Sequence, residues 1–165
     1  VCSSDLLTLM SEDLDQRTLY LQRCKELGIT PNSKVKGMLP DTAIPEPDCA
    51  TYDLHRNFLG DRGVLAVADA VALNKKFTTL NLRDNGLRNN GTIAVVNMLK
   101  AHPRLTSLDV SHNQISTNGG MALLDLLKSN ANLTDLQFSN NRMDVNVRLK
   151  LKSALEENVR AAKEA

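Results

Sequence analysis

Four asparagines recur in the sequence at a fixed interval of 28 residues, and this period constrains the fold more than any other feature. They are Asn57, Asn85, Asn113 and Asn141. Each follows a short run in which apolar and polar residues alternate, and each precedes an amphipathic stretch. A period of roughly 20 to 50 residues with this texture predicts a solenoid, in which every unit buries its apolar face against the next.

Alignment at this period produces four consistent apolar columns, three before the asparagine and one after it. They are Cys49, Phe77, Leu105 and Leu133; Tyr52, Leu80, Leu108 and Leu136; Leu54, Leu82, Val110 and Phe138; and Leu59, Leu87, Ile115 and Met143. The alternation before the asparagine predicts a short strand with one buried face, paired in parallel with the same strand of the neighbouring repeats. We expect each asparagine amide to satisfy backbone groups that the following turn leaves unpaired, which is a structural role.

The second half of each repeat is predicted to be a helix. Apolar residues recur four apart at Val67 and Val71, Val95 and Leu99, Leu123 and Leu127, and Leu151 and Leu155. Gly63, Gly91 and Gly119 mark the start of the first three helices, where we expect a side chain to collide with the neighbouring turn. The fourth repeat carries Val147 in this column.

The spacing L-x-x-L-x-L-x-x-N-x-L resembles the leucine-rich-repeat consensus. A 28-residue unit with a full helix resembles the ribonuclease-inhibitor-like subfamily of these repeats, and the resemblance covers Cys49 to Asn158. It implies an α/β fold: a short curved solenoid of four β-turn-α repeats, with a parallel concave sheet and convex helices. It also implies protein binding without catalysis.

Residues 1–48 do not fit the repeat and are predicted to form an N-terminal helical cap followed by an extended connector, which would cover the open core of the first repeat. Leu6 to Met10 is apolar. Arg17 to Leu27 is predicted to be a helix that Gly28 stops, and a second short helix follows Pro31 as far as Leu39. Residues 41–48, with two prolines, form the connector.

The segment from Tyr20 to Leu27, followed by Pro31, Val35 and Leu39, is similar to the segment that precedes the repeats in centrosomal and basal-body leucine-rich-repeat proteins that continue into coiled coils. This resemblance implies a cytoskeletal setting at a centrosome, basal body, cilium or flagellum.

The fourth repeat is predicted to end the stack, because Lys150 and Lys152 replace the small or apolar residues of the earlier helices. The repeat domain is therefore assigned to residues 49–158, and residues 159–165 to a continuation of the last helix. That continuation is either an extended capping helix or the start of a coiled coil outside this chain, through which the protein would form a homo-oligomer. The chain begins with Val1, which indicates a fragment of a longer protein.

Composition narrows the classes of function. The chain has 20 Lys and Arg against 19 Asp and Glu, so it lacks the basic field that a nucleic-acid partner needs. Three cysteines without metal-ligand spacing indicate a reducing, cytoplasmic compartment, and no stretch is long and apolar enough for a membrane. The three histidines, His55, His102 and His112, form no catalytic motif. We expect no enzyme, no cofactor and no metal.

The candidate partner-binding surface is the concave face together with the strand ends. Its residues are Asp53, His55, Asn81, Arg83, Asp84, Asp109, Ser111, His112, Asp135 and Gln137. The face is polar and mildly acidic, which favours a basic or hydroxyl-rich peptide; the alternative is a solvated face without a partner. Basic residues cluster at the carboxyl-terminal ends of the helices, where the helix dipole stabilises positive charge. An alternative interpretation is that they bind acidic partners. These basic residues are Lys75, Lys76, Lys100, Arg104 and Lys128.

The sequence therefore predicts a non-catalytic protein-interaction domain of a larger cytosolic, cytoskeletal scaffold protein. Two alternatives stay open at this point. One is a regulator of an enzyme such as a small GTPase. The other is self-association through the convex helices, where Met121 to Leu127 is apolar.

Overall fold

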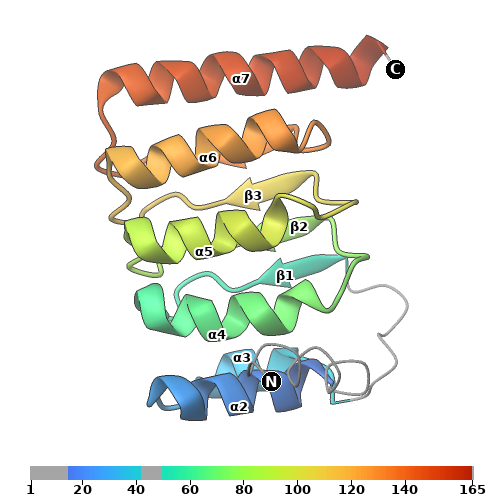
Figure 1. Ribbon diagram of the computed structural model, residues 1–165, viewed down its shortest axis with the longest axis vertical. Coiled ribbons are helices and arrows are strands. Elements are labelled where there is room, and N and C mark those ends of the chain that lie inside the picture. The colour runs from blue at the N-terminus through green and yellow to red at the C-terminus, as the bar shows by residue number, and fades with distance from the viewer. Residues whose placement is uncertain (1–14, 42–49, 165) are drawn as a thin grey trace, which may run out of the picture.

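The computed structural model describes residues 15–41 and 50–164, and it contains four strand–helix units that follow a pair of helices. The N-terminal pair is α2 (Gln16–Leu27) and α3 (Ser33–Met38). The units are β1 (Thr51–Asp53) with α4 (Gly60–Ala72), β2 (Thr79–Asn81) with α5 (Asn89–Leu99), β3 (Ser107–Asp109) with α6 (Thr117–Ser129), and β4 (Asp135–Gln137) with α7 (Val145–Glu164). Helices α4 to α7 stack in one layer and the strands lie behind them (Figure 1). The predicted α/β repeat fold with an N-terminal helical cap is confirmed.

The strands form one parallel sheet in the order β1-β2-β3-β4. Each strand pairs with the next in a register that matches the repeat, so that Tyr52, Leu80, Leu108 and Leu136 lie side by side. These four side chains are buried, as are the helix residues spaced four apart from Val67 to Leu127. One continuous apolar core therefore lies between the sheet and the helices, because each repeat buries its apolar face only against its neighbours.

The cap is joined to the first repeat by hydrogen bonds. Tyr52 donates from its hydroxyl to Oε1 of Gln16 over 2.8 Å, and Nδ2 of Asn32 donates to the carbonyl of Asn57 over 3.0 Å. Within the cap, the amide of Asn32 donates to the Tyr20 hydroxyl over 2.9 Å. Burial, which outweighs that hydrogen bond, raises the pKa of Tyr20 to about 12. Helix α2 ends at Gly28, whose φ of 62° is the left-handed conformation predicted for the stop. The apolar segment Leu6 to Met10 and residues 42–49 of the predicted connector lie outside the described residues.

At the other end of the stack, the face of α7 that would meet a fifth repeat is polar. Lys150 and Lys152 are exposed, whereas the residues of the same columns in α4 to α6 are buried or half-buried. Val147 is buried although it replaces the glycine of the other repeats, because α6 supplies Gly120 opposite it. A Cβ on Gly120 would lie 2.7 Å from Cγ1 of Val147, so the absence of a side chain at Gly120 on the facing helix makes room for Val147.

Candidate functional site

Two columns of hydrogen-bonding side chains run through the stack and border the candidate surface. In the first, Oδ1 of Asn85 accepts from the amide of Asn57, and Oδ1 of Asn113 accepts from the amide of Asn85, each over 3.0 Å. The side-chain amides of all four repeat asparagines donate to backbone carbonyls of the preceding strand or turn. Asn32 of the cap extends this column by donating to the carbonyl of Asn57. The column therefore serves the backbone and leaves no amide for a ligand.

The second column lies near the amino-terminal ends of the strands, in the turns that follow the helices, and contains Asn74, His102, Asn130 and Asn158. His102 is 3% exposed and packs against Phe77, with ring centroids 4.1 Å apart. Nε2 of His102 lies 3.1 Å from the carbonyl of Asn74, and Nδ1 lies 3.4 Å from the amide of Arg104. A neutral ring that carries its proton on Nε2 satisfies both partners. Burial lowers the pKa of His102, the bond to Asn74 opposes this effect, and the nearby charge of Lys75 adds to it.

We expect His102 to make the folded state less stable in mild acid. Its folded-state pKa lies below the ordinary 6.5, so the unfolded chain takes up the proton first as the pH falls. The stabilisation of the fold by neutral His102 is fully present above pH 6.5 and is lost as the pH falls from 6.5 toward the folded-state pKa. The loss in the free energy of unfolding is about 1.4 kcal/mol for each pH unit between the unfolded-state and folded-state pKa. His102→Asn, which places the residue of the neighbouring repeats in this column, should remove this part of the pH dependence measured by urea unfolding. Parallel pH profiles for the two proteins would contradict the prediction; His112→Asn, at an exposed position, is the control.

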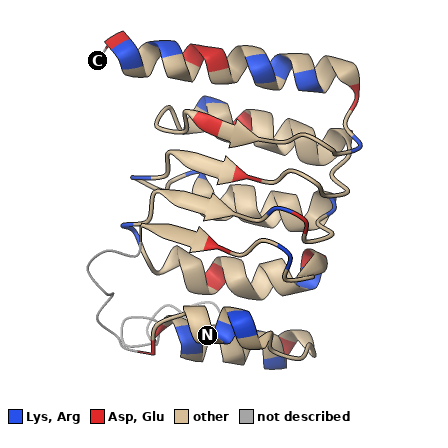
Figure 2. Ribbon diagram, turned by 180° about the vertical axis from the view of Figure 1, so that it is seen from behind, with Lys and Arg blue, Asp and Glu red and all other residues tan. Residues whose placement is uncertain are grey.

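The open face of the sheet carries side chains that pair across adjacent repeats. Asn81 donates from Nδ2 to Oδ1 of Asp53 over 2.9 Å, and Ser107 donates from its hydroxyl to Asp135 over 2.8 Å. Nδ1 of His55 lies 2.7 Å from Oδ1 of Asp53. Partial burial opposes ionisation of Asp53, but the hydrogen bonds from His55 outweigh it and lower the pKa of the carboxyl group. Figure 2 shows acidic residues on strands of this face.

Side chains also pair across adjacent repeats just after the strands end. Arg56 pairs with Asp84 over 3.1 Å, and Nδ2 of Asn140 lies 2.9 Å from Nε2 of His112. Gln137 donates to Asp135 over 2.9 Å. Among the described residues, the guanidinium of Arg83 is exposed and makes no hydrogen bond or ion pair. The predicted residues other than Ser111 are therefore exposed or half-exposed on the open face or at the strand ends.

Ser111 is a correction to the predicted surface. Its side chain belongs to a residue that is only 3% exposed, so it does not face a partner. The carboxylate of Asp109 accepts the amide of Ser111 over 2.8 Å, and the carbonyl of Ser111 accepts from the amide of Asp84. Arg83 and Ser139, which occupy the same column in the neighbouring repeats, are exposed, so the burial is specific to the third repeat and the alternation of the strand did not indicate it.

Phe58 is a surface feature that the sequence analysis missed. It is 90% exposed and has a φ of 51°, in the left-handed region that bulky residues avoid. It occupies the variable position between Asn57 and Leu59, where the second repeat has Gly86 with a φ of 71°. An open pocket of about 420 Å³ lies beside it, between the cap and the first repeat, and Tyr20, Ile29 and Arg62 help to line it. An aromatic residue in a variable column was the signal available in the sequence.

Replacement of Phe58 by glycine should stabilise the fold by about 0.5–1 kcal/mol. The left-handed conformation costs an L-residue about 1–2 kcal/mol, whereas glycine loses about 0.5–1 kcal/mol of backbone entropy instead. Little burial is lost, because Phe58 is almost fully exposed. Gln114→Gly in the same column should destabilise the fold, since Gln114 has no positive φ. Urea unfolding of both variants is the measurement, and equal destabilisation by the two changes would refute the strain argument.

The convex face does not carry the apolar run expected from the sequence. Within Met121 to Leu127, all four leucines are buried in the core. The exposed apolar residues of this face are instead Ile93, Met121, Val145 and Leu149. Within the described ranges there is no cluster of three potential metal ligands, and no helix has the length and apolar character to cross a membrane.

Two stretches of the chain, residues 73–96 and 102–124, match the family model described as Leucine Rich repeat. The two matched stretches lie in the second and third strand–helix units of the fold. No curated protein matches this sequence.

Two solved structures share the fold. One is titled "Leiomodin-1 Actin-Binding Site 2 (ABS2)"; it has a TM-score of 0.61 and 16% sequence identity, and the match covers 89% of this chain and 91% of that one. The other is the tropomodulin C-terminal domain of Caenorhabditis elegans, with a TM-score of 0.50, 13% identity, and coverage of 72% of this chain and 89% of that one. At these identities the likeness concerns the fold alone.

Proposed function

We propose that this chain is a non-catalytic protein-interaction domain of the ribonuclease-inhibitor-like class, and that it binds a cytoskeletal protein through the open face of its sheet. The surface consists of Asp53, His55, Asn81, Arg83, Asp84, Asp109, His112, Asp135 and Gln137, together with Phe58 beside it. The proposal depends on a difference between two sets of side chains. The repeat asparagines Asn85 and Asn113 are buried and bond to the backbone of the neighbouring repeat. Asp53, Asn81 and Asp109 of the sheet face are instead solvent-accessible, and they bond to the backbone of their own repeat only.

The side chains of the sheet face support a protein partner. Two of its carboxylates are held in place by polar groups of the neighbouring repeat, since Asp53 accepts from Asn81 and Asp135 accepts from Ser107. Arg83 and Phe58 are residue types enriched in the cores of protein interfaces, and both are exposed without a partner in the described chain. A small number of such anchors typically carries most of the binding energy of an interface.

The structural likeness to a domain titled as an actin-binding site makes actin the first partner to test. The N-terminal segment from Tyr20 to Leu39 supports a centrosomal or flagellar scaffold as the setting. A cytoplasmic location, and oligomer formation through a coiled coil after residue 165, belong to the same proposal.

Co-sedimentation with filamentous actin tests both the partner and the surface. We expect the chain to bind, and Arg83→Glu and Phe58→Ala each to weaken binding by more than about tenfold, as expected of a hot spot. Lys36→Glu, the same charge change at an exposed position of α3, should bind like the parent chain. If the chain binds but both surface variants bind equally well, the sheet face is not the site. If the parent chain stays in the supernatant, actin is not the partner.

A further inference from the structure

A second surface lies at the edge of the stack where helices end and strands begin. It is an open groove of about 650 Å³. Thr78, Thr106 and Thr134, which occupy one position in three successive repeats, contribute to its lining, and Ala161 and Ala162 of α7 complete it. The proposed actin surface lies on the open face of the sheet and at the ends of the strands, and none of its residues lines the groove, so the groove is a separate feature.

The groove exists because α7 is longer than the other helices of the repeats. Helices α4, α5 and α6 have 13, 11 and 13 residues and end before the turn, whereas α7 has 20 and continues through it. Asn158 fixes this extension, because its Nδ2 donates to the carbonyls of Leu127, Asn130 and Leu133 over 3.0, 3.3 and 3.0 Å. The two alanines that follow are small, which leaves space above the threonines.

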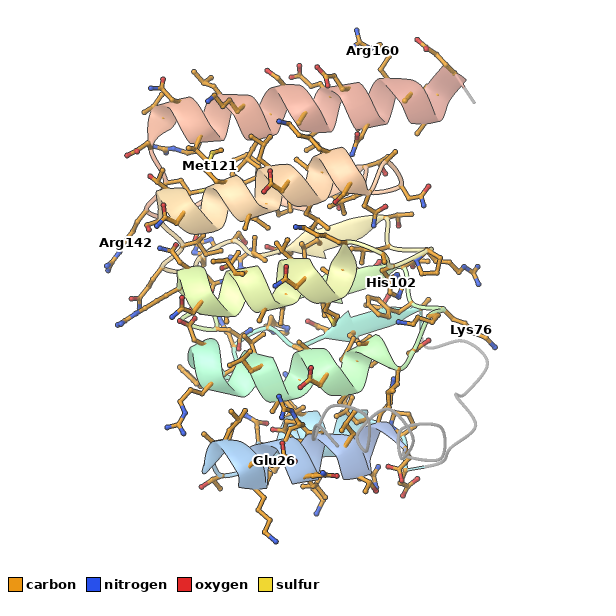
Figure 3. All side chains as sticks on the ribbon, viewed as in Figure 1. Glu26, Lys76, His102, Met121, Arg142 and Arg160 are labelled. Carbon is orange, nitrogen blue, oxygen red and sulfur yellow. The ribbon has the colours of Figure 1, made fainter. Side chains whose placement is uncertain are left out.

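The lining is neutral except for one cation. Arg104 is the charged residue among the groove residues, and none of them is acidic. Lys75 and Lys76 precede Thr78 at the same edge and are exposed, and none of these three side chains pairs with a carboxylate among the described residues. Lys76 extends from this edge in Figure 3, whereas Arg142 lies at the opposite edge. Glu157 and Glu164 of α7 are exposed but do not line the groove.

We propose that this groove binds an extended acidic segment of a partner protein. The lining has no large apolar residue, so it does not offer the surface that an amphipathic helix needs. The hydroxyls of Thr78 and Thr106 donate to backbone carbonyls within the stack, and their lone pairs remain able to accept from the amides of a bound peptide. Carboxylates of the segment would lie near Arg104, Lys75 and Lys76. This proposal does not rest on the sheet face or on actin.

The test measures fluorescence anisotropy of a labelled twelve-residue peptide of alternating glutamate and serine with the full 165-residue chain. Arg104→Glu should weaken binding about fivefold or more, on the scale of reversing one or two exposed charge pairs. Ala161→Trp, which fills the groove without a change of charge, should weaken it similarly. Ala131→Trp fills the groove from a different repeat and replaces Ala161→Trp if that variant does not fold.

Two matched variants separate the groove from general attraction by positive charge. Arg142→Glu makes the same charge change at the opposite edge, and Ser153→Trp places the same bulk at an exposed position of α7 outside the groove; both should change affinity less than twofold. Equal weakening by Arg104→Glu and Arg142→Glu would overturn the proposal. So would unchanged binding by the groove-filling variants, or tighter binding of a twelve-nucleotide RNA than of the peptide.

Discussion

Replacement of Asn113 by alanine is expected to destabilise the fold by about 3–5 kcal/mol. Oδ1 of Asn113 accepts from the amides of Asn85 and Leu87, each over 3.0 Å. Nδ2 donates to three carbonyls, two in its own repeat and one, that of Leu82, in the preceding repeat. Alanine leaves these buried backbone groups without partners, and each unsatisfied buried group costs about 1–3 kcal/mol.

The position of an asparagine in the stack should set the size of the effect. Asn141 is half-exposed, and its Oδ1 accepts from the amide of Ile115 over 3.0 Å. Water can replace part of what Asn141 supplies, so Asn141→Ala should cost about 1–2 kcal/mol, close to the net value of one or two hydrogen bonds.

Two measurements check this order. Urea unfolding followed by circular dichroism gives the free energies, and hydrogen exchange reports on the individual amides. The amides of Asn85 and Leu87 should lose protection in Asn113→Ala and keep it in Asn141→Ala. If Asn113→Ala were no more destabilising than Asn141→Ala, the asparagines would not act as a column in which each repeat satisfies the previous one.

The period of the sequence was sufficient to predict much of this fold. Because residues 28 apart occupy equivalent positions, the alignment predicted which side chains are buried, that the strands are parallel, and that Lys150 and Lys152 face outward. Each repeat adopts the same local structure, so a pattern that is weak in a single repeat becomes a reliable signal when four copies share it.

Features confined to a single repeat are what the sequence did not predict. Ser111 is buried, although Arg83 and Ser139 in the same column are exposed. Phe58 occupies a variable position, and its exposure depends on the left-handed backbone of one loop. The edge groove depends on how far α7 continues past Asn158, which no earlier repeat could indicate.

Replacement of Gly91 by alanine should destabilise the fold by about 1–3 kcal/mol, although alanine is the better helix former. The new Cβ would lie 2.5 Å from Oδ1 and 3.0 Å from Cα of Asp61, on the helix of the preceding repeat. Asp61 cannot easily move away, because its Oδ1 accepts from the amide of Arg88 at the start of α5 over 2.7 Å. Overpacking of this kind typically costs about 1–3 kcal/mol, more than the gain in helix propensity.

Gly37→Ala is the matched control, since a Cβ on Gly37 in α3 would meet nothing within 4 Å. It should stabilise the fold by about 0.5–1 kcal/mol, the ordinary difference between glycine and alanine in a helix. Urea unfolding compares the two variants, and the double variant Asp61→Ala with Gly91→Ala should be more stable than the sum of the single effects predicts. Stabilisation by Gly91→Ala would show that the stack has room at this contact.

The same contact recurs between the second and third repeats. Asn89 occupies the column of Asp61, and its Oδ1 accepts from the amides of Ser116 and Gly119 over 3.0 Å, so it caps α6 from the preceding helix. In the next repeat this column holds Thr117, which donates to the carboxylate of Asp144 instead. The fourth repeat has Val147 in the glycine column, and Gly120 on the facing helix leaves room for it. At Gly91 and Gly119, glycine therefore permits a polar side chain of the preceding helix to cap the next helix, and Gly91→Ala tests that relationship directly.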